Sequence, residues 1–113
     1  MAPLNDECNR AQDLVIGVAT QGSTCDATDI ITSVCGVDPN EVFYNVNGQA
    51  GASYSVTVSA GAVLKRMLTC SMTEGGCVTS DTLVCSATGA CSQIYLVETA
   101  GACGLFTITA TQL

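Results

Sequence analysis

The stretch that decides the fold reads Cys70-Ser71-Met72-Thr73-Glu74-Gly75-Gly76-Cys77 and continues through Cys85, Cys91 and Cys103 to the run Gly104-Leu105-Phe106-Thr107-Ile108-Thr109-Ala110. It holds five of the eight cysteines, separated by short apolar runs. Cross-links and strand pairing must therefore both be satisfied within about a third of the chain. The other segments have to arrange themselves around this cysteine-rich stretch.

The number of cysteines indicates an oxidising compartment. Eight cysteines in 113 residues is several times ordinary usage, and an even number suits complete pairing. Zinc binding is the alternative, but zinc ligands are typically spaced C-x2-C or C-x4-C, often with His. This chain has no His, and its cysteines from Cys70 to Cys91 are more widely spaced. We therefore expect a structural disulfide framework and an extracellular location, or one at a cell or virion surface.

Charge and length exclude several classes of function. Ten acidic residues against three basic ones give a net charge of −7, which removes the basic surface that binding to phosphate backbones requires. Nucleic acid is therefore excluded as a partner. Anionic membrane surfaces are disfavoured by the same charge, and the apolar runs are shorter than the ~20 residues that span a bilayer, so we expect no membrane insertion. The length suits a single domain over residues 1–113.

The pattern of apolar residues predicts an all-β fold. β-branched residues and Gly are frequent, and no window shows the apolar spacing of a helix. Residues 54–59 alternate strictly, so Tyr54, Val56 and Val58 should face a core. Further strands are expected at 13–18, 23–28, 42–47, 62–72, 82–85, 93–97 and 105–110, with a long loop over 29–41. About eight strands with frequent turn signals predict an antiparallel two-sheet β-sandwich.

Nothing in the chain is arranged for catalysis. A nucleophilic Ser, Thr or Cys needs a neighbouring base, the chain lacks His, and cysteines in disulfides are neither nucleophiles nor redox groups. Two carboxylate pairs, Asp26 with Asp29 and Asp38 with Glu41, are the nearest candidates for acid–base work on a sugar. A spacing of three on strands or loops does not make two carboxylates face each other. We therefore expect a protein that is not an enzyme and has no cofactor.

Calcium is the metal ion that the acidic and amide side chains would suit, because it accepts carboxylate, amide and carbonyl oxygens without strict spacing. No D-x-D-x-D-G loop occurs, so caps, Asx turns and solubilising charge are the favoured interpretation of these residues. The candidate ligands are Asn5, Asp6, Asp26, Asp29 and Asp38.

Carbohydrate binding would need exposed aromatic rings. Tyr44, Tyr54 and Tyr95 would each stack on a sugar face if they were exposed, but with no Trp and few aromatics a core position is favoured for each.

Several short motifs, in a consistent order, resemble those of a known family. They are Asn5-Asp6-Glu7-Cys8 with Ala11 and Leu14, Gly22-Ser23-Thr24 with Ala27-Thr28, Cys35-Gly36, Val42-Phe43-Tyr44 with Val46, and Gly101 with Gly104 and Phe106-Thr107-Ile108-Thr109. Together they are similar to the pre-peptidase C-terminal (PPC-like) secreted β-sandwich repeats. The resemblance implies a jelly-roll-like sandwich that serves extracellular enzymes or adhesins as a non-catalytic binding or accessory unit.

The departures from that family concern an aromatic residue and two cysteines. Phe43 stands where the family usually has Trp. Cys25 and Cys103 occupy positions that the family normally fills with other residues, and their joint appearance implies a mutual bond. Eight cysteines allow many connectivities. For the other six we predict the pairs Cys8–Cys35, Cys70–Cys91 and Cys77–Cys85.

Two functions remain open from the sequence. The first, which is favoured, is a non-catalytic extracellular binding, adhesion or accessory module for a protein or carbohydrate at the cell surface. The second is a self-assembling structural subunit of an extracellular filament, sheath or viral surface, in which copies join through their edge strands.

Overall fold

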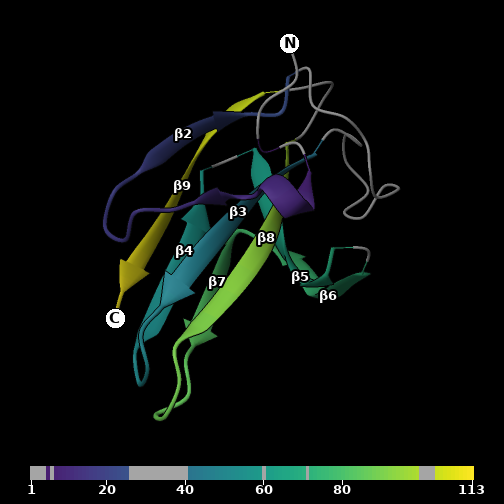
Figure 1. Ribbon diagram of the computed structural model, residues 1–113. Coiled ribbons are helices and arrows are strands. Elements are labelled where there is room, and N and C mark those ends of the chain that lie inside the picture. The colour runs from purple at the N-terminus through teal and green to yellow at the C-terminus, as the bar shows by residue number, and fades with distance from the viewer. Residues whose placement is uncertain (1–4, 6, 26–40, 60, 71, 100–103) are drawn as a thin grey trace.

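The computed structural model describes residues 5, 7–25, 41–59, 61–70, 72–99 and 104–113 (Figure 1). Within these residues the chain forms one short 3-10 helix and nine strands, so the predicted all-β class is confirmed. No helix in these ranges is long and apolar enough to cross a membrane. The elements are η1 (Cys8–Arg10), β1 (Gln12–Asp13), β2 (Thr20–Ser23), β3 (Glu41–Gly48), β4 (Ser53–Val58), β5 (Ala62–Thr69), β6 (Met72–Val78), β7 (Ser80–Val84), β8 (Cys91–Thr99) and β9 (Leu105–Gln112).

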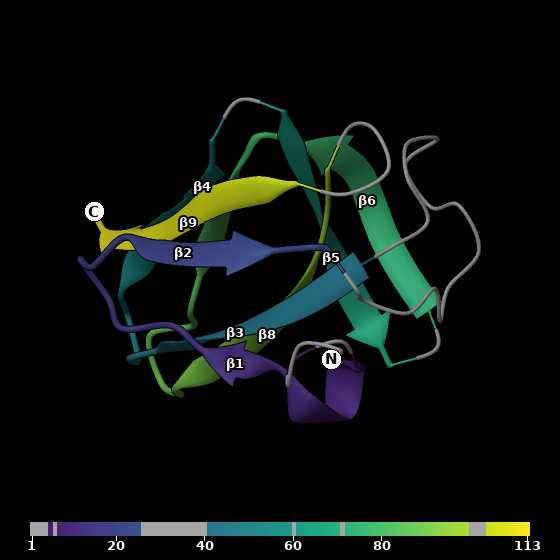
Figure 2. The ribbon, with the colours of Figure 1, turned by 90° about the horizontal axis from the view of Figure 1, so that it is seen from above.

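The strands form two facing sheets (Figure 2). One sheet has the order β1-β3-β8-β5-β6 and the other has the order β2-β9-β4-β7. From β2 onward the chain changes sheet at every connection except the β5–β6 hairpin, and all these strands pair antiparallel. This is the strand order of an eight-stranded jelly roll, to which β1 adds a short parallel strand beside β3. The predicted two-sheet sandwich is therefore confirmed.

The main core lies between the two sheets and follows the alternation of the strands. Tyr54 and Val56 are almost completely buried and Val58 packs against the core, as the pattern of residues 54–59 predicts. Tyr44 meets Phe106 edge to face, with ring centroids 5.9 Å apart, and so joins the two inner faces. The other large buried residues of this core are Leu14, Val42, Val46, Leu64, Leu83, Tyr95, Val97 and Ile108.

A second, smaller apolar cluster lies on the other side of the five-stranded sheet. Phe43 and Leu96 lie opposite each other on β3 and β8, and both are fully buried. Met67 and Cys8 are also buried and complete this cluster. The N-terminal segment is fastened here, because Asn5 Nδ2 donates to the Phe43 carbonyl (3.0 Å) and the Phe43 N–H donates to the Asn5 carbonyl (2.8 Å). The five-stranded sheet therefore has apolar residues on both faces at this end.

Three of the expected strands differ from the structure. Residues 13–18 are mostly a turn: β1 ends at Asp13, and Gly17 has a φ of 85°, which a side chain would disfavour. Expected strand 62–72 divides into β5 and the start of β6. The Gly75-Gly76 pair concealed β6, because Gly lowers strand propensity and Gly75 has a φ of 73°. The strand expected at 23–28 begins earlier, because β2 runs from Thr20 to Ser23. Residues 26–40, which include the second half of that expected strand and nearly all of the expected loop 29–41, lie outside the described residues.

The disulfide pairing differs from the predicted one. Cys8 is bonded to Cys70 and Cys85 to Cys91, with Cα–Cα distances of 5.4 and 5.3 Å. The predicted pairs Cys8–Cys35, Cys70–Cys91 and Cys77–Cys85 are therefore wrong. Each cysteine bonds to one that the fold brings near it. Cys70, in the turn after β5, lies beside Cys8 of η1, and Cys85 and Cys91 lie at the two ends of the connection from β7 to β8. Cys25 and Cys77 are also disulfide-bonded. Cys103 lies outside the described residues, so the Cys25–Cys103 pair stays a prediction.

Candidate functional site

A groove of about 310 Å³ opens where β5 and β8 part. The ladder between these strands runs from Ala62↔Thr99 to Arg66↔Tyr95 and stops there, whereas β8 continues its pairing with β3 as far as Cys91. The end of β5 and the first residues of β8 therefore diverge, and the space between them becomes this groove. We call it the β5–β8 groove, lined by Met67, Leu68, Thr69, Glu74, Ser92, Gln93 and Ile94 together with the Cys8–Cys70 disulfide.

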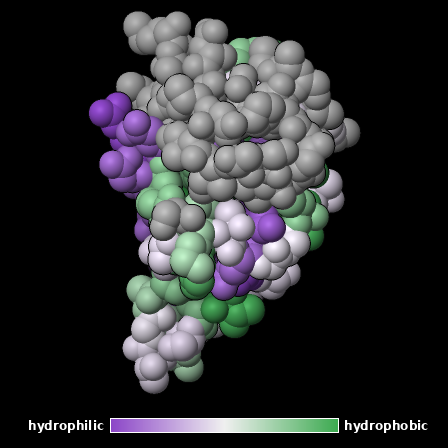
Figure 3. All heavy atoms as spheres, turned by 90° about the vertical axis from the view of Figure 1, so that its right-hand side faces the viewer, coloured by the Kyte–Doolittle hydropathy of each residue, from purple (hydrophilic) through white to green (hydrophobic). Residues whose placement is uncertain are grey.

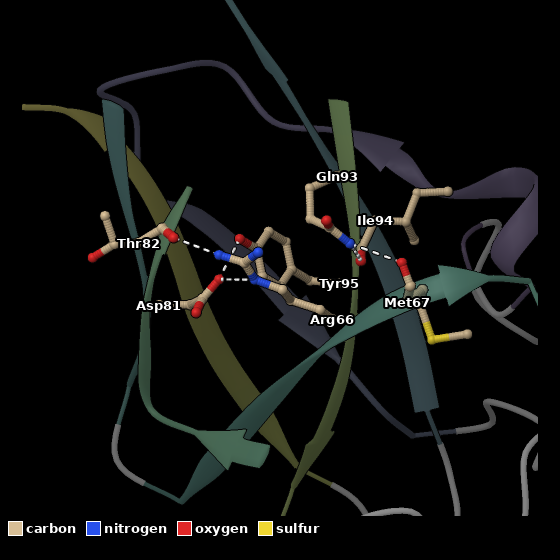
Figure 4. A network of polar contacts seen from close by, with 7 residues as sticks. All are labelled: Arg66, Met67, Asp81, Thr82, Gln93, Ile94 and Tyr95. Atoms are coloured by element: carbon tan, nitrogen blue, oxygen red, sulfur yellow. Dashed lines mark hydrogen bonds and ion pairs between the residues drawn. The ribbon is translucent and has the colours of Figure 1, made fainter. Parts of the chain in front are cut away.

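Gln93 bridges the two strands at the point where their ladder ends (Figure 4). Its Nε2 donates to the carbonyls of Met67 and Ile94, each at 2.9 Å. Because carbonyl oxygens only accept hydrogen bonds, the nitrogen of the Gln93 amide must face them. The Gln93 Oε1 accepts no hydrogen bond from the described residues and remains an acceptor at the groove.

The walls of the β5–β8 groove combine apolar side chains with the polar Thr69, Ser92 and Gln93, and the described lining residues include one carboxylate. Met67 is buried, Leu68 is 56% exposed, and Met72 is 55% exposed just beyond the turn of the β5–β6 hairpin. Glu74 supplies the carboxylate from β6. Seen from the β5–β6 side, the apolar surface lies in separate patches among polar residues (Figure 3). A second hollow, lined by Glu7, Cys8, Asn9 and Cys70, also borders the disulfide.

A charged network connects the two sheets near the groove (Figure 4). Arg66 Nε lies 2.6 Å from Asp81 Oδ2, and the Tyr95 hydroxyl donates to the same oxygen at 2.7 Å. Arg66 comes from β5 and Tyr95 from β8 in one sheet, whereas Asp81 comes from β7 in the other. The side chains of Arg66 and Asp81 are 31% and 22% exposed, so the ion pair is only partly screened by solvent.

Arg66 also covers an edge strand. In the antiparallel β4–β7 ladder, hydrogen-bonded and non-hydrogen-bonded residue pairs alternate. The Val58 N–H donates to the Thr79 carbonyl and the Cys85 N–H to the Ala52 carbonyl, which shows which pairs are hydrogen-bonded. Thr82 belongs to a non-hydrogen-bonded pair, so its carbonyl points to the outer side of β7. Arg66 Nη2 donates to that carbonyl. A covered carbonyl weakens β7 as a template for another strand.

Burial and the hydrogen bond to Asp81 raise the pKa of Tyr95 above its usual value, in that order of importance. The hydrogen bond from Arg66 to Asp81 likewise raises the pKa of Arg66. Burial also raises the pKa of Tyr44, and a hydrogen bond with the Asn5 side chain opposes that effect. The folded protein therefore holds the Tyr95 and Tyr44 protons more tightly than the unfolded chain does.

This difference predicts a loss of stability in alkali. The stabilisation is fully present below pH ~10, the usual pKa of tyrosine, and is lost as the pH rises toward the higher folded pKa values. We expect Tyr95→Phe to lower the free energy of unfolding by about 1 kcal/mol at pH 7 and to make its decline above pH ~10 less steep. Urea denaturation followed by circular dichroism at several pH values measures both effects. Equal slopes in the two proteins would contradict the prediction.

The structure describes only one of the five calcium ligands expected from the sequence, so the calcium site stays a prediction. The Asn5 side chain donates to the Phe43 main chain, and Asp6, Asp26, Asp29 and Asp38 lie outside the described residues. Within the described ranges no group of three or more acidic or Cys side chains is placed to hold a metal ion. Glu41 is fully buried on β3 opposite Glu98 of β8. The carboxylate pair that the sequence suggests between Glu41 and Asp38 stays untested, because Asp38 lies outside the described residues.

All the aromatic residues of the chain lie in the interior. The chain has three Tyr, two Phe and no Trp. Each of the five is at most 3% exposed, so the prediction that the tyrosines are core residues is confirmed, and no aromatic ring is available to stack on a sugar. The five residues are Phe43, Tyr44, Tyr54, Tyr95 and Phe106.

The fold and its cross-links define a disulfide-braced jelly-roll sandwich, and its disulfides are typical of an oxidising environment. Comparison with known protein families, curated proteins and solved structures found no match for this chain. The resemblance to the PPC-like modules therefore rests on the sequence motifs alone.

Proposed function

We propose that this chain is a non-catalytic extracellular binding module whose partner is a protein, and that the β5–β8 groove is its binding surface. The observation that carries the proposal is the groove itself, with Leu68 and Met72 exposed beside it. The Cys8–Cys70 disulfide and the Gln93 hydrogen bonds fix the strands that form it. A groove held in this way loses little conformational entropy on binding, which favours affinity.

A protein suits this surface better than a carbohydrate. Sugars are commonly held by stacking on exposed aromatic rings, and every ring of this chain is buried. Leu68 and Met72 are exposed aliphatic side chains, and Met adapts to irregular partner surfaces. The core of a protein–protein interface is built from such contacts with a polar rim around them.

A binding role also agrees better with the chemistry of the groove than catalysis does. Glu74 is the one carboxylate among the lining residues that the structure describes, and these residues hold no pair of carboxylates such as glycoside hydrolysis uses. The chain has no His to activate Ser92 as a nucleophile. The disulfides and the motifs shared with secreted PPC-like modules support an extracellular setting.

Substitution of the exposed apolar side chains tests this function. We expect the wild-type chain to bind at least one member of a panel of extracellular proteins from its source organism and no member of a glycan array. Leu68→Ser with Met72→Ser should weaken that binding about tenfold or more, because it removes apolar contacts from the interface. Biolayer interferometry measures the affinities.

The matched control is Val84→Ser with Leu105→Ser, which removes two apolar side chains from the four-stranded sheet that are somewhat more exposed than Leu68 and Met72. We expect this control to bind like the wild type. Equal losses in the two double variants, or binding to glycans instead of proteins, would overturn the proposal.

A self-assembling structural subunit is the second candidate, and strand β6 favours it. This edge strand is seven residues long, and all but one of its residues are exposed, so it offers backbone groups to a neighbouring strand. Shifts in the β5–β6 register and the positive φ of Gly75 make its edge irregular, which disfavours such pairing. Size-exclusion chromatography and electron microscopy separate the two functions. A monomer at all concentrations supports the module, and ordered polymers support the subunit.

A further inference from the structure

We propose that the β5–β8 groove takes the cationic side chain of a lysine or arginine on the protein partner. This inference rests on the binding function proposed above and names the chemistry that the groove recognises. It follows from three properties of the lining residues: their hydrogen-bonding groups, their charge and their apolar walls.

The groove offers two acceptor groups, from Gln93 and Glu74, and the hydroxyl of Ser92, which can accept as well as donate. The Gln93 Nε2 is already used by two carbonyls, which leaves its Oε1 to accept. Glu74 forms no hydrogen bond or ion pair with the described residues, so both of its oxygens can also accept. A lysine ammonium offers three donors and an arginine guanidinium five, and neither accepts a hydrogen bond. The groove therefore offers acceptors to a group that only donates, and the Ser92 hydroxyl can turn to accept from it as well.

The charge of the groove has the same sign as that of the chain. No Lys or Arg is among the lining residues. Arg66 lies opposite Glu74 in the β5–β6 ladder and attracts it electrostatically, but the Arg66 guanidinium is bound directly to Asp81 and to the Thr82 carbonyl. Arg10 is near Glu7, with 3.7 Å between Nε and Oε2. With a net charge of −7, the chain attracts a cation to this groove and repels an anion.

The walls suit the rest of such a side chain. Met67, Leu68 and Ile94 offer apolar surface to the methylene stem of lysine or arginine while the charged end reaches Glu74. A purely apolar side chain would fill the same space but would take Glu74 and the Gln93 Oε1 out of water without a partner, which costs free energy. The volume of about 310 Å³ is at the small end of the range for ligand pockets.

Titrations of the isotopically labelled chain with amino-acid derivatives test this inference. The probes are the N-acetyl, N-methylamide derivatives of arginine, lysine and norleucine, the last being an uncharged side chain of similar length. We expect at least one cationic probe to shift the amide resonances of Leu68, Glu74, Gln93 and Ile94 in a saturable way. The norleucine probe should bind about fivefold or more weakly.

Two variants that each remove one negative charge show which carboxylate binds the cationic probe. Glu74→Gln should weaken binding of the cationic probe about fivefold without changing that of norleucine. Asp13→Asn is the matched control, because it removes the same charge from β1, the opposite edge of the same sheet, and should leave all three affinities unchanged. Equal binding of norleucine and the cationic probes, no effect of Glu74→Gln, or shifts spread over the whole surface would each overturn the inference.

The failure of this inference can be told from the failure of the proposed function. If the cationic probes do not bind the groove but Leu68→Ser with Met72→Ser still abolishes binding to a protein, the cation inference is wrong and the binding function stands. If that double variant binds proteins as the wild type does, the groove is not the binding surface and both proposals are wrong.

Discussion

Replacing both Cys8 and Cys70 by alanine should lower the free energy of unfolding by about 4 kcal/mol. The bond closes a loop with a sequence separation of 62 residues, and a disulfide stabilises a protein mainly by restricting the unfolded chain, more so for longer loops. It also fastens η1 over Phe43 and Met67, so the loss loosens the second apolar cluster. Guanidinium denaturation under non-reducing conditions measures the change.

The Cys85–Cys91 bond provides the comparison. Its separation is only six residues, so Cys85→Ala with Cys91→Ala should cost about 2 kcal/mol. Replacing both cysteines of a pair avoids a reactive free thiol in either variant. If the two double variants were equally destabilised, restriction of the unfolded chain would not be the main source of stability, and local packing would explain it better.

Replacing Gly48 by alanine should cost about 3 kcal/mol, at the upper end for an added methyl group in a packed core. Gly48 is the last residue of β3 and lies beside the Cys85–Cys91 disulfide. A Cβ there would overlap Cys85 Sγ and lie 2.8 Å from the ring of Tyr54, both of which are buried and held in place. Urea denaturation, with the midpoint and slope both recorded, measures the loss.

Two controls separate overlap from a general effect of replacing glycine. Gly76→Ala on β6 places its Cβ in open space and should change the free energy of unfolding by less than about 0.5 kcal/mol. In a Cys85→Ala, Cys91→Ala background, Gly48→Ala should cost less, because the sulfur atoms that it meets are gone. An unchanged cost in that background would show that the disulfide is not what excludes the side chain.

The class and much of the core of this fold could be predicted from the sequence because they depend on short-range alternation. Residues 54–59 show a strict period of two, and β4 follows it with Tyr54 and Val56 inside. The strand expected at 105–110 likewise corresponds to β9. β6 was missed because its Gly75-Gly76 pair has the composition of a turn, and only pairing with β5 makes it a strand.

The disulfides and the groove depend on contacts that are distant in sequence. Nothing in the spacing of Cys8 and Cys70 reveals that the turn after β5 meets η1. The groove forms because the ladder between β5 and β8 stops at Tyr95, which no local pattern records. The groove's position is therefore a property of the whole sandwich.

One signal for the polar residues was present in the sequence. Gln93 shares the period of Tyr95 and Val97, so it is a polar residue at a position that the alternation assigns to the interior. Asp81 stands in the same relation to Leu83 on β7. Polar residues that interrupt an inward-facing series predict a hydrogen-bonded network or the margin of a cavity, because a buried polar group needs a partner.

The burial of every aromatic ring has a consequence for optical spectroscopy. The aromatic signals of this chain in the near ultraviolet come only from side chains of the interior, since it has no Trp and all five rings are inside. Tyrosine emission therefore reports unfolding and is insensitive to a partner that docks on the surface. A single Trp introduced in place of Leu68 would be the one indole of the chain, and its emission would report the surface alone.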